Sequence, residues 1–187
     1  MTTRLLLLSL SASALWTASA QTPIAIANAL FLDDDVKCGS GQSCYAANIS
    51  GWLCGPNTGI QIMSKTQYPS APAIGFYSAA LGGSNGSGSI FQTLGVTVQA
   101  NTTYTLKVHV GARADFQFTG YEAELLAGNV LLAEGNNATP VGGTFVTETI
   151  VYYSGANPPQ LGQPFQVYIR STGFGQADVD AVFLTVE

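Results

Sequence analysis

The sequence predicts an all-β protein, either a sandwich or a barrel, and three observations predict it. The chain after residue 21 consists of short alternating or apolar runs separated by Gly, Pro, Asn and Ser. No run keeps a helical period over a useful length. Of the 187 residues 47% are apolar and 9% are charged, with 21 Gly and 8 Pro, and this composition excludes disordered, collagen and coiled-coil proteins.

Residues 1–20 predict a secretory signal peptide. Arg4 gives a positive start, an apolar run follows from Leu5 to Trp16, and Ala18-Ser19-Ala20 forms a cleavage site before Gln21. A membrane span needs about 20 apolar residues, which neither this run nor any later one supplies. We therefore expect residues 21–187 to form one domain that is secreted or periplasmic and has no membrane span after cleavage.

The predicted strands follow one another through short loops. In chain order they are Ile24–Leu32, Gly59–Met63, Ile74–Leu81, Ser89–Leu94, Thr103–Val110, Tyr121–Leu126, Val130–Ala133, Phe145–Tyr153, Phe165–Arg170 and Ala177–Val186. In Thr103–Val110 the apolar residues alternate with polar ones, which is typical of a half-buried strand. Ala177–Val186 is apolar on both faces, which predicts a central strand.

Three cysteines lie in the irregular segment 33–57, and export favours their oxidation. Cys38, Cys44 and Cys54 are an odd number, so at most one bridge forms within the chain, and the sequence does not say which two residues pair. A zinc site would lack a fourth ligand, because no histidine lies nearby.

The acidic residues gather in two places. Asp33, Asp34 and Asp35 follow the first predicted strand, and Asp178 and Asp180 lie in the last one. By strand parity the last two share a face with three apolar residues, namely Val182, Leu184 and Val186. A buried carboxylate needs compensation. First and last strands of antiparallel sandwiches are often neighbours, so Asp33, Asp34 and Asp180 are candidate Ca²⁺ ligands. The alternative is that these aspartates are solvated turn residues.

The sequence carries few features of other functional classes. The net charge of −5 provides no basic surface for nucleic acid. His109 is the sole histidine, and the motifs of serine hydrolases, zinc proteases and nucleotide-binding proteins are missing. Aromatic side chains in or beside loops can contact sugar rings or apolar ligands. Phe116, Phe118 and Phe174 are the candidates of this kind.

Several segments resemble known families. Asn28-Ala29-Leu30-Phe31-Leu32-Asp33 and Gly51-Trp52 resemble the start of galactose-binding-like jelly-roll domains, the fold of many carbohydrate-binding modules. From about residue 89 onward the chain is closer to secreted bacterial proteins that include the hapalindole-type (Stig) cyclases. The segments that carry this likeness are Gln99–Leu106, Gly120-Tyr121, Glu124–Gly128, Gly143-Thr144-Phe145, Leu161-Gly162-Gln163 and Asp178–Val182.

The resemblance implies an antiparallel two-sheet β-sandwich of the jelly-roll kind, stabilised by calcium and forming a homodimer. In the cyclases an aspartate of the last-strand motif donates the proton for a Cope rearrangement and cyclisation of an indole isonitrile, and this role would fall on Asp178 or Asp180. Aromatic pocket residues of the family would correspond to Phe76, Phe116 and Phe118. The chain departs from the family pattern at Leu32, Ser78 and Ala181.

The sequence therefore favours a secreted, calcium-binding β-sandwich that binds a carbohydrate or another small ligand. One alternative is a cyclase-like isomerase that uses Asp178 or Asp180 as a general acid. Another is an extracellular structural protein without a ligand, because the fold alone does not carry the activity.

Overall fold

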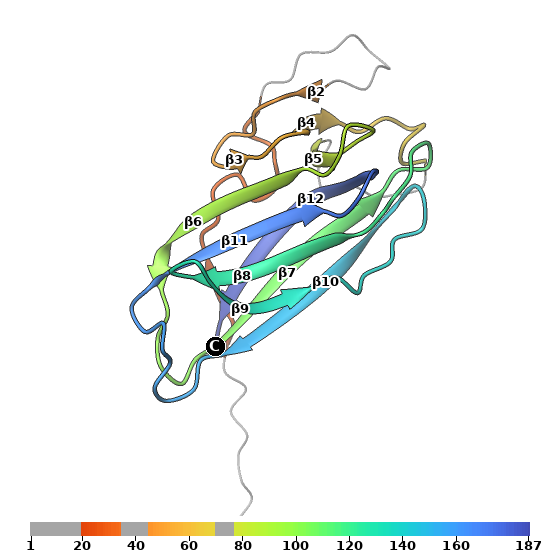
Figure 1. Cartoon of the computed structure of the whole chain (residues 1–187). Coiled ribbons are helices and arrows are strands. Elements are labelled where there is room, and N and C mark those ends of the chain that lie inside the picture. Colours follow the sequence, from red (N-terminus) through yellow and green to blue (C-terminus); the bar gives the residue numbers. More distant parts are fainter. Residues whose placement is uncertain (1–19, 35–44, 70–76) are drawn as a thin grey trace, which may run out of the picture.

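Two antiparallel sheets face each other in a β-sandwich (Figure 1). The computed structural model describes residues 20–34, 45–69 and 77–187. Its strands are β1 (Thr22–Ile24), β2 (Tyr45–Ala46), β3 (Leu53–Cys54), β4 (Thr58–Ile62), β5 (Tyr77–Gly82), β6 (Ser89–Thr97), β7 (Thr103–Ala112), β8 (Tyr121–Ala127), β9 (Val130–Gly135), β10 (Thr144–Tyr153), β11 (Pro164–Ser171) and β12 (Gln176–Val186). The predicted all-β sandwich is confirmed.

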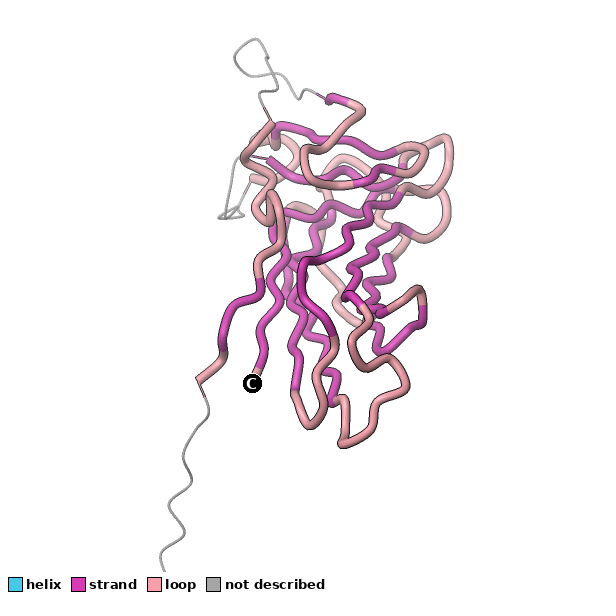
Figure 2. Tube along the Cα trace, turned by 90° about the vertical axis from the view of Figure 1, so that its left-hand side faces the viewer, coloured by secondary structure: helices cyan, strands magenta, loops and turns pink. Residues whose placement is uncertain are grey.

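The strand order explains the central place of the last strand. Sheet A runs β10-β7-β12-β5-β4-β2, and sheet B runs β3-β6-β11-β8-β9. β12 lies between β7 and β5, as its two apolar faces predicted. Its C-terminal end also pairs with β1, from Ile24 opposite Leu184 to Thr22 opposite Val186, so the first and last strands are neighbours (Figure 2).

The core fills the space between the sheets. In β7 the alternate residues Tyr104, Leu106, Val108 and Val110 are buried in it, while Lys107 is exposed on the outer face of sheet A. The period-2 pattern therefore assigned the two faces of this strand correctly. No helix in the described ranges is long and apolar enough to cross a membrane.

The predicted strand Ile24–Leu32 is wrong beyond its first residue. Strand β1 ends at Ile24, and the chain then turns through Asn28 and Phe31, whose φ angles are 47° and 57°. The amide of Phe31 donates to the carbonyl of Asn28 at 3.1 Å, which closes the turn. The turn inserts the Phe31 ring into the core against Trp52, with a centroid distance of 5.8 Å. The turn that buries this ring is therefore favoured over the extended strand that the apolar run predicts.

The predicted parity of the last strand is also wrong. The register with β7 shifts between Val179 and Ala181, which places a bulge at Asp180. As a result Val179 and Val182 both face the core, although they differ in sequence parity. A bulge inserts one unpaired residue and exchanges the two faces of the strand beyond it. Asp178 therefore projects from the outer face of sheet A, opposite to Val182.

Some predictions fall on residues outside the described ranges. They are the signal peptide up to residue 19, Asp35, Cys38, Cys44 and Phe76. The cysteine pairing therefore stays a prediction. Cys54 carries a free thiol, partly buried, and it has no disulfide with a described residue.

Candidate active site

Asp178 is fully buried on the outer face of sheet A. Its register neighbours are two small residues, Ala80 of β5 and Gly111 of β7. Gln61 of β4 and Ser78 of β5 lie next to it on the same face, and their side chains are buried as well. The outer face of the sheet thus holds a polar cluster at this point.

The segment between β4 and β5 closes over the carboxylate with Tyr68. The amides of Gln67 and Tyr68 both donate to the carbonyl of Ser64, at 3.1 and 2.9 Å, which forms a turn. The Tyr68 ring stacks on Phe145 of β10 at 4.6 Å, and the Ala114 amide donates to the Gln67 carbonyl at 2.9 Å. These contacts hold the Tyr68 side chain, which is 3% exposed, above sheet A.

Three side chains donate hydrogen bonds to Asp178. Gln61 Nε2 donates to Oδ2 at 2.6 Å, and Gln176 Nε2 donates to Oδ1 at 2.6 Å. The Tyr68 hydroxyl donates a short hydrogen bond to Oδ2. The donors come from β4, β12 and the β4–β5 segment, so the site exists only in the folded chain. A carboxylate buried without such partners would be strongly destabilising.

Burial raises the pKa of Asp178 to about 6, although the hydrogen bonds from Gln176, Tyr68 and Gln61 act to lower it. Burial disfavours the charged form because it removes water, and this effect is the larger one here. Near neutral pH the carboxyl group can therefore both hold and release a proton. Burial of the ring, together with the neighbouring Asp178 carboxylate, raises the pKa of Tyr68, which stays a neutral hydroxyl.

Arg113, near the end of β7, connects this cluster to an exposed loop. Its NH1 group donates to Gln176 Oε1 at 3.1 Å, while its other nitrogens bind both oxygens of Asp115. The same guanidinium lies over the ring of Phe116, 5.5 Å from the centroid. The orientation of Gln176, and through it Asp178, thus depends on the position of this loop.

The loops that carry the aromatic candidates adjoin. The β7–β8 loop and the β11–β12 loop are joined by the Gln176 amide, which donates to the Gln117 carbonyl at 2.9 Å. Phe116 is 38% exposed and Phe174 is 73% exposed. Phe118 packs instead against the core and lies beside Tyr121. Of the predicted ligand contacts, Phe116 and Phe174 are therefore available at the surface.

Asp180, the other predicted acid, lies at the bulge and is 1% exposed. Its Oδ1 is 3.4 Å from Nδ1 of His109, the residue that pairs with Ala181 across the sheet. Asp180 thus belongs to a second polar group, next to the Asp178 cluster on the same strand.

The predicted calcium ligands are not gathered into one site. Among the described residues no three His, Cys, Asp or Glu side chains lie close enough to hold a metal. Asp34 accepts hydrogen bonds from Ser50 N at 3.0 Å, Ser50 Oγ at 2.8 Å and Asn28 Nδ2 at 2.9 Å. A cation at Asp34 would have to compete with these donors for the carboxylate oxygens. Calcium binding by Asp33, Asp34 and Asp180 stays a prediction.

Most of the partners of Asp178 were not predicted from the sequence. Gln61 and Gln176 are amides at the buried positions of strands, and such polar residues in apolar runs are a signal that could have marked them. Tyr68 and Arg113 lie in or beside loops, and nothing in the local sequence connects them with Asp178. Their contacts depend on the strand order.

Comparisons with known proteins agree with the fold. The sequence profile of the HpiC1 cyclase family matches residues 22–185. The Stig cyclase Fisc from Fischerella sp. TAU, in complex with (3Z)-3-(1-methyl-2-pyrrolidinylidene)-3H-indole, is 25% identical with a TM-score of 0.78, covering 90% of this chain and 98% of the cyclase. A cyclase from Fischerella sp. TAU in complex with 4-(1H-indol-3-yl)butan-2-one is 25% identical with a TM-score of 0.76, covering 89% and 98%.

Other comparisons are weaker. No sequence among the functionally curated proteins matches the chain. A family 16 carbohydrate-binding module aligns at 13% identity and a TM-score of 0.44, covering 68% of this chain and 84% of the module. That likeness carries no functional argument.

Proposed function

The chain belongs to the HpiC1 cyclase family, and we propose that it is an exported acid catalyst that isomerises or cyclises an unsaturated aromatic small molecule. The observation that carries the proposal is the fully buried carboxyl group of Asp178, held by three neutral donors with its pKa raised to about 6. Residues 1–20 would direct export.

Asp178 fits the role of a proton donor. A general acid works best when its pKa lies near the working pH. After the proton has left, the three donors Gln61, Tyr68 and Gln176 would stabilise the carboxylate. Tyr68 covers the carboxyl group, so its ring has to move for a substrate to reach the acid directly.

The substrate class is proposed from the relatives. Two solved cyclase structures from Fischerella sp. TAU, each 25% identical to this chain, contain indole compounds. Phe116, which lies under Arg113 beside the cluster, supports an aromatic ligand. We therefore propose an indole-type substrate. Carbohydrate binding, which the sequence favoured, has weaker support, because the relatives that carry an argument are cyclases.

Turnover by the mature chain of an indole isonitrile that also carries the 1,5-diene required for a Cope rearrangement tests the proposal. Chromatography with mass detection would follow the cyclised product for the wild type, Asp178→Asn and Asp180→Asn. We expect Asp178→Asn to lower the rate about 100-fold or more, and the wild-type rate to fall as the pH rises above about 6. Glu134→Gln, on the exposed side of β9, is the matched control and should keep the wild-type rate.

Two outcomes would overturn this function. The first is unchanged turnover in Asp178→Asn. The second is that the wild type neither converts the isonitrile nor binds 4-(1H-indol-3-yl)butan-2-one in a calorimetric titration, while it binds oligosaccharides. The homodimer implied by the resemblance stays a prediction, which light scattering on the mature chain would test.

A further inference from the structure

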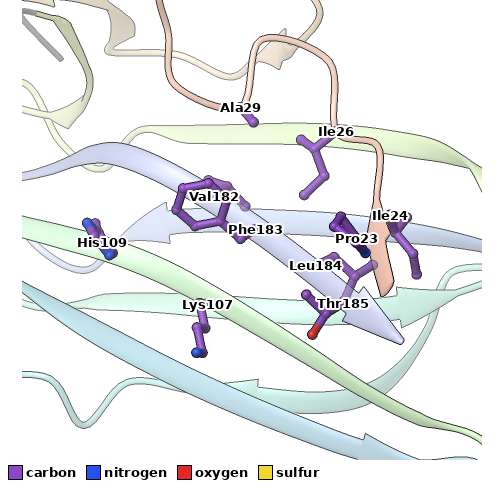
Figure 3. A pocket seen from close by; sticks show the side chains of 10 residues that line it. All are labelled: Pro23, Ile24, Ile26, Ala29, Lys107, His109, Val182, Phe183, Leu184 and Thr185. Carbon is purple, nitrogen blue, oxygen red and sulfur yellow. The ribbon is translucent and has the colours of Figure 1, made fainter. Parts of the chain in front are cut away.

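A groove of about 420 Å³ lies beside β12 (Figure 3). Ile24, Ile26 and Ala29 of the N-terminal segment form one wall, and Phe183 of β12 lies opposite to them. Its size is in the range of small-molecule sites, which are about 300 to 1,000 Å³. Asp178 does not line the groove, so it is separate from the proposed active site.

The floor of the groove is apolar although it faces the outside of sheet A. Phe183 is 39% exposed, and its ring meets the His109 ring edge-on with centroids 6.1 Å apart. Ile24 and Ile26 are partly buried against the core and present their remaining surface to the groove. Covering apolar surface of this kind with a ligand is favourable, because it removes the surface from water.

The polar side of the groove carries positive charge. Lys107 and His109, both on β7, line it together, and no carboxylate is among the lining residues. The described ion pairs engage Arg113 with Asp115 and Arg170 with Glu122, whereas none engages Lys107. Asp180 lies next to His109, with its Oδ1 3.4 Å from Nδ1. In a chain with a formal charge of −5, Lys107 thus places a cation on the groove without a described ion-pair partner.

We propose that this groove binds an amphipathic organic monocarboxylate. Its apolar body would lie on Phe183, Ile26 and Ile24, and its carboxylate would meet Lys107, with His109 beside it. The charge of Lys107, which no described carboxylate neutralises, selects an anionic head group over a neutral one. The site does not depend on the acid chemistry proposed for Asp178.

A matched pair of ligands tests the proposal. Calorimetric titration of the mature chain with 4-phenylbutyrate and with 4-phenylbutan-1-ol separates the charged head group from the apolar body. We expect the acid to bind about five-fold more tightly than the alcohol, as one partly exposed ion pair allows. Lys107→Met, which keeps an apolar stem of similar length, should abolish this preference and leave the affinity for the alcohol unchanged.

Three further variants locate the binding. Ala29→Phe places a ring in the groove and should weaken the binding of both ligands at least ten-fold. Lys65→Met removes the charge of another exposed lysine, and Asp178→Asn alters the proposed active site, so both should bind the acid like the wild type. Circular dichroism would confirm that each variant is folded. Equal affinity for acid and alcohol, or a preference that survives Lys107→Met, would overturn the proposal.

Discussion

The Tyr68 hydroxyl donates a short hydrogen bond to Oδ2 of Asp178, so a residue of the β4–β5 segment closes the site around a carboxyl group of the last strand. The two residues are 110 positions apart in the sequence. Tyr68 both covers the carboxyl group and stabilises its charged form. This pair therefore connects the stability of the loop with the protonation of the site.

Tyr68→Phe should raise the pKa of Asp178 further. The variant keeps the ring that stacks on Phe145 but removes a donor that lowers this pKa. We also expect the free energy of unfolding to fall by about 1 to 3 kcal/mol near neutral pH, the usual cost of a lost hydrogen bond to a buried group. Carboxyl ¹³C chemical shifts would follow the titration. An unchanged midpoint would mean that the hydroxyl does not stabilise the carboxylate.

Asp178 should make the protein more stable as the pH falls from about 7 to about 4. Its pKa is about 6 in the folded chain and has its ordinary value of 3.8 in the unfolded chain. The folded state therefore binds more protons in this window, and the free energy of unfolding falls as the pH rises through it. The difference in pKa corresponds to about 3 kcal/mol at most.

Urea unfolding of the wild type and of Asp178→Asn across this pH window measures that contribution. The comparison isolates one group, because the other titrating residues are common to both proteins. Asp178→Asn should lack the rise in stability on acidification. If the two proteins show parallel pH profiles, Asp178 does not titrate with a raised pKa.

Asp34→Ala should destabilise the chain equally in calcium and in EDTA. The carboxylate accepts hydrogen bonds from Ser50 and Asn28, and so joins two loops without a metal. Its loss should lower the free energy of unfolding by about 1 to 2 kcal/mol. Asp33→Ala, at the exposed neighbouring position, should have a smaller effect. A loss of stability seen in calcium but absent in EDTA would instead identify Asp34 as a calcium ligand.

The residues themselves explain which features the sequence could predict. The alternation of polar and apolar residues predicted the two faces of β7 correctly, because the polarity of each side chain there matches its burial. It failed for β12, because the bulge at Asp180 reverses the faces and no residue type marks a bulge. It also failed at Asn28 and Phe31, where a turn with positive φ angles serves the packing of one ring.

The candidate acids were predictable and their surroundings were not. Asp178 and Asp180 stand out as charges in an apolar run. Gln61 and Tyr68 become neighbours of Asp178 only through the pairing of β4 with β5 and of β5 with β12. A local pattern contains no information about such long-range contacts. For this reason the sequence suggested a cation or a proton for Asp178, whereas the structure adds neutral donors.

The contribution of Glu148 to stability should change with pH in the opposite direction from that of Asp178. It is 8% exposed in β10 and accepts a short hydrogen bond from the Tyr121 hydroxyl, together with bonds from the amides of Asn137 and Ala138 at 2.8 and 3.0 Å. Burial alone would raise the pKa of Glu148, but the hydrogen bonds outweigh it and lower the pKa below its ordinary value of 4.5. The folded state then binds fewer protons than the unfolded one. Its contribution is present above about pH 4.5 and is lost on further acidification.

Glu148→Gln and Tyr121→Phe, alone and combined, test this assignment in a double-mutant cycle. Each single change should cost about 1 to 3 kcal/mol near neutral pH, because it leaves the other buried group without its partner. The double variant should cost less than the sum, since the two side chains share one hydrogen bond. The coupling should disappear at a pH low enough to protonate Glu148. Strictly additive losses near neutral pH would show that the Tyr121 hydroxyl does not stabilise the Glu148 carboxylate.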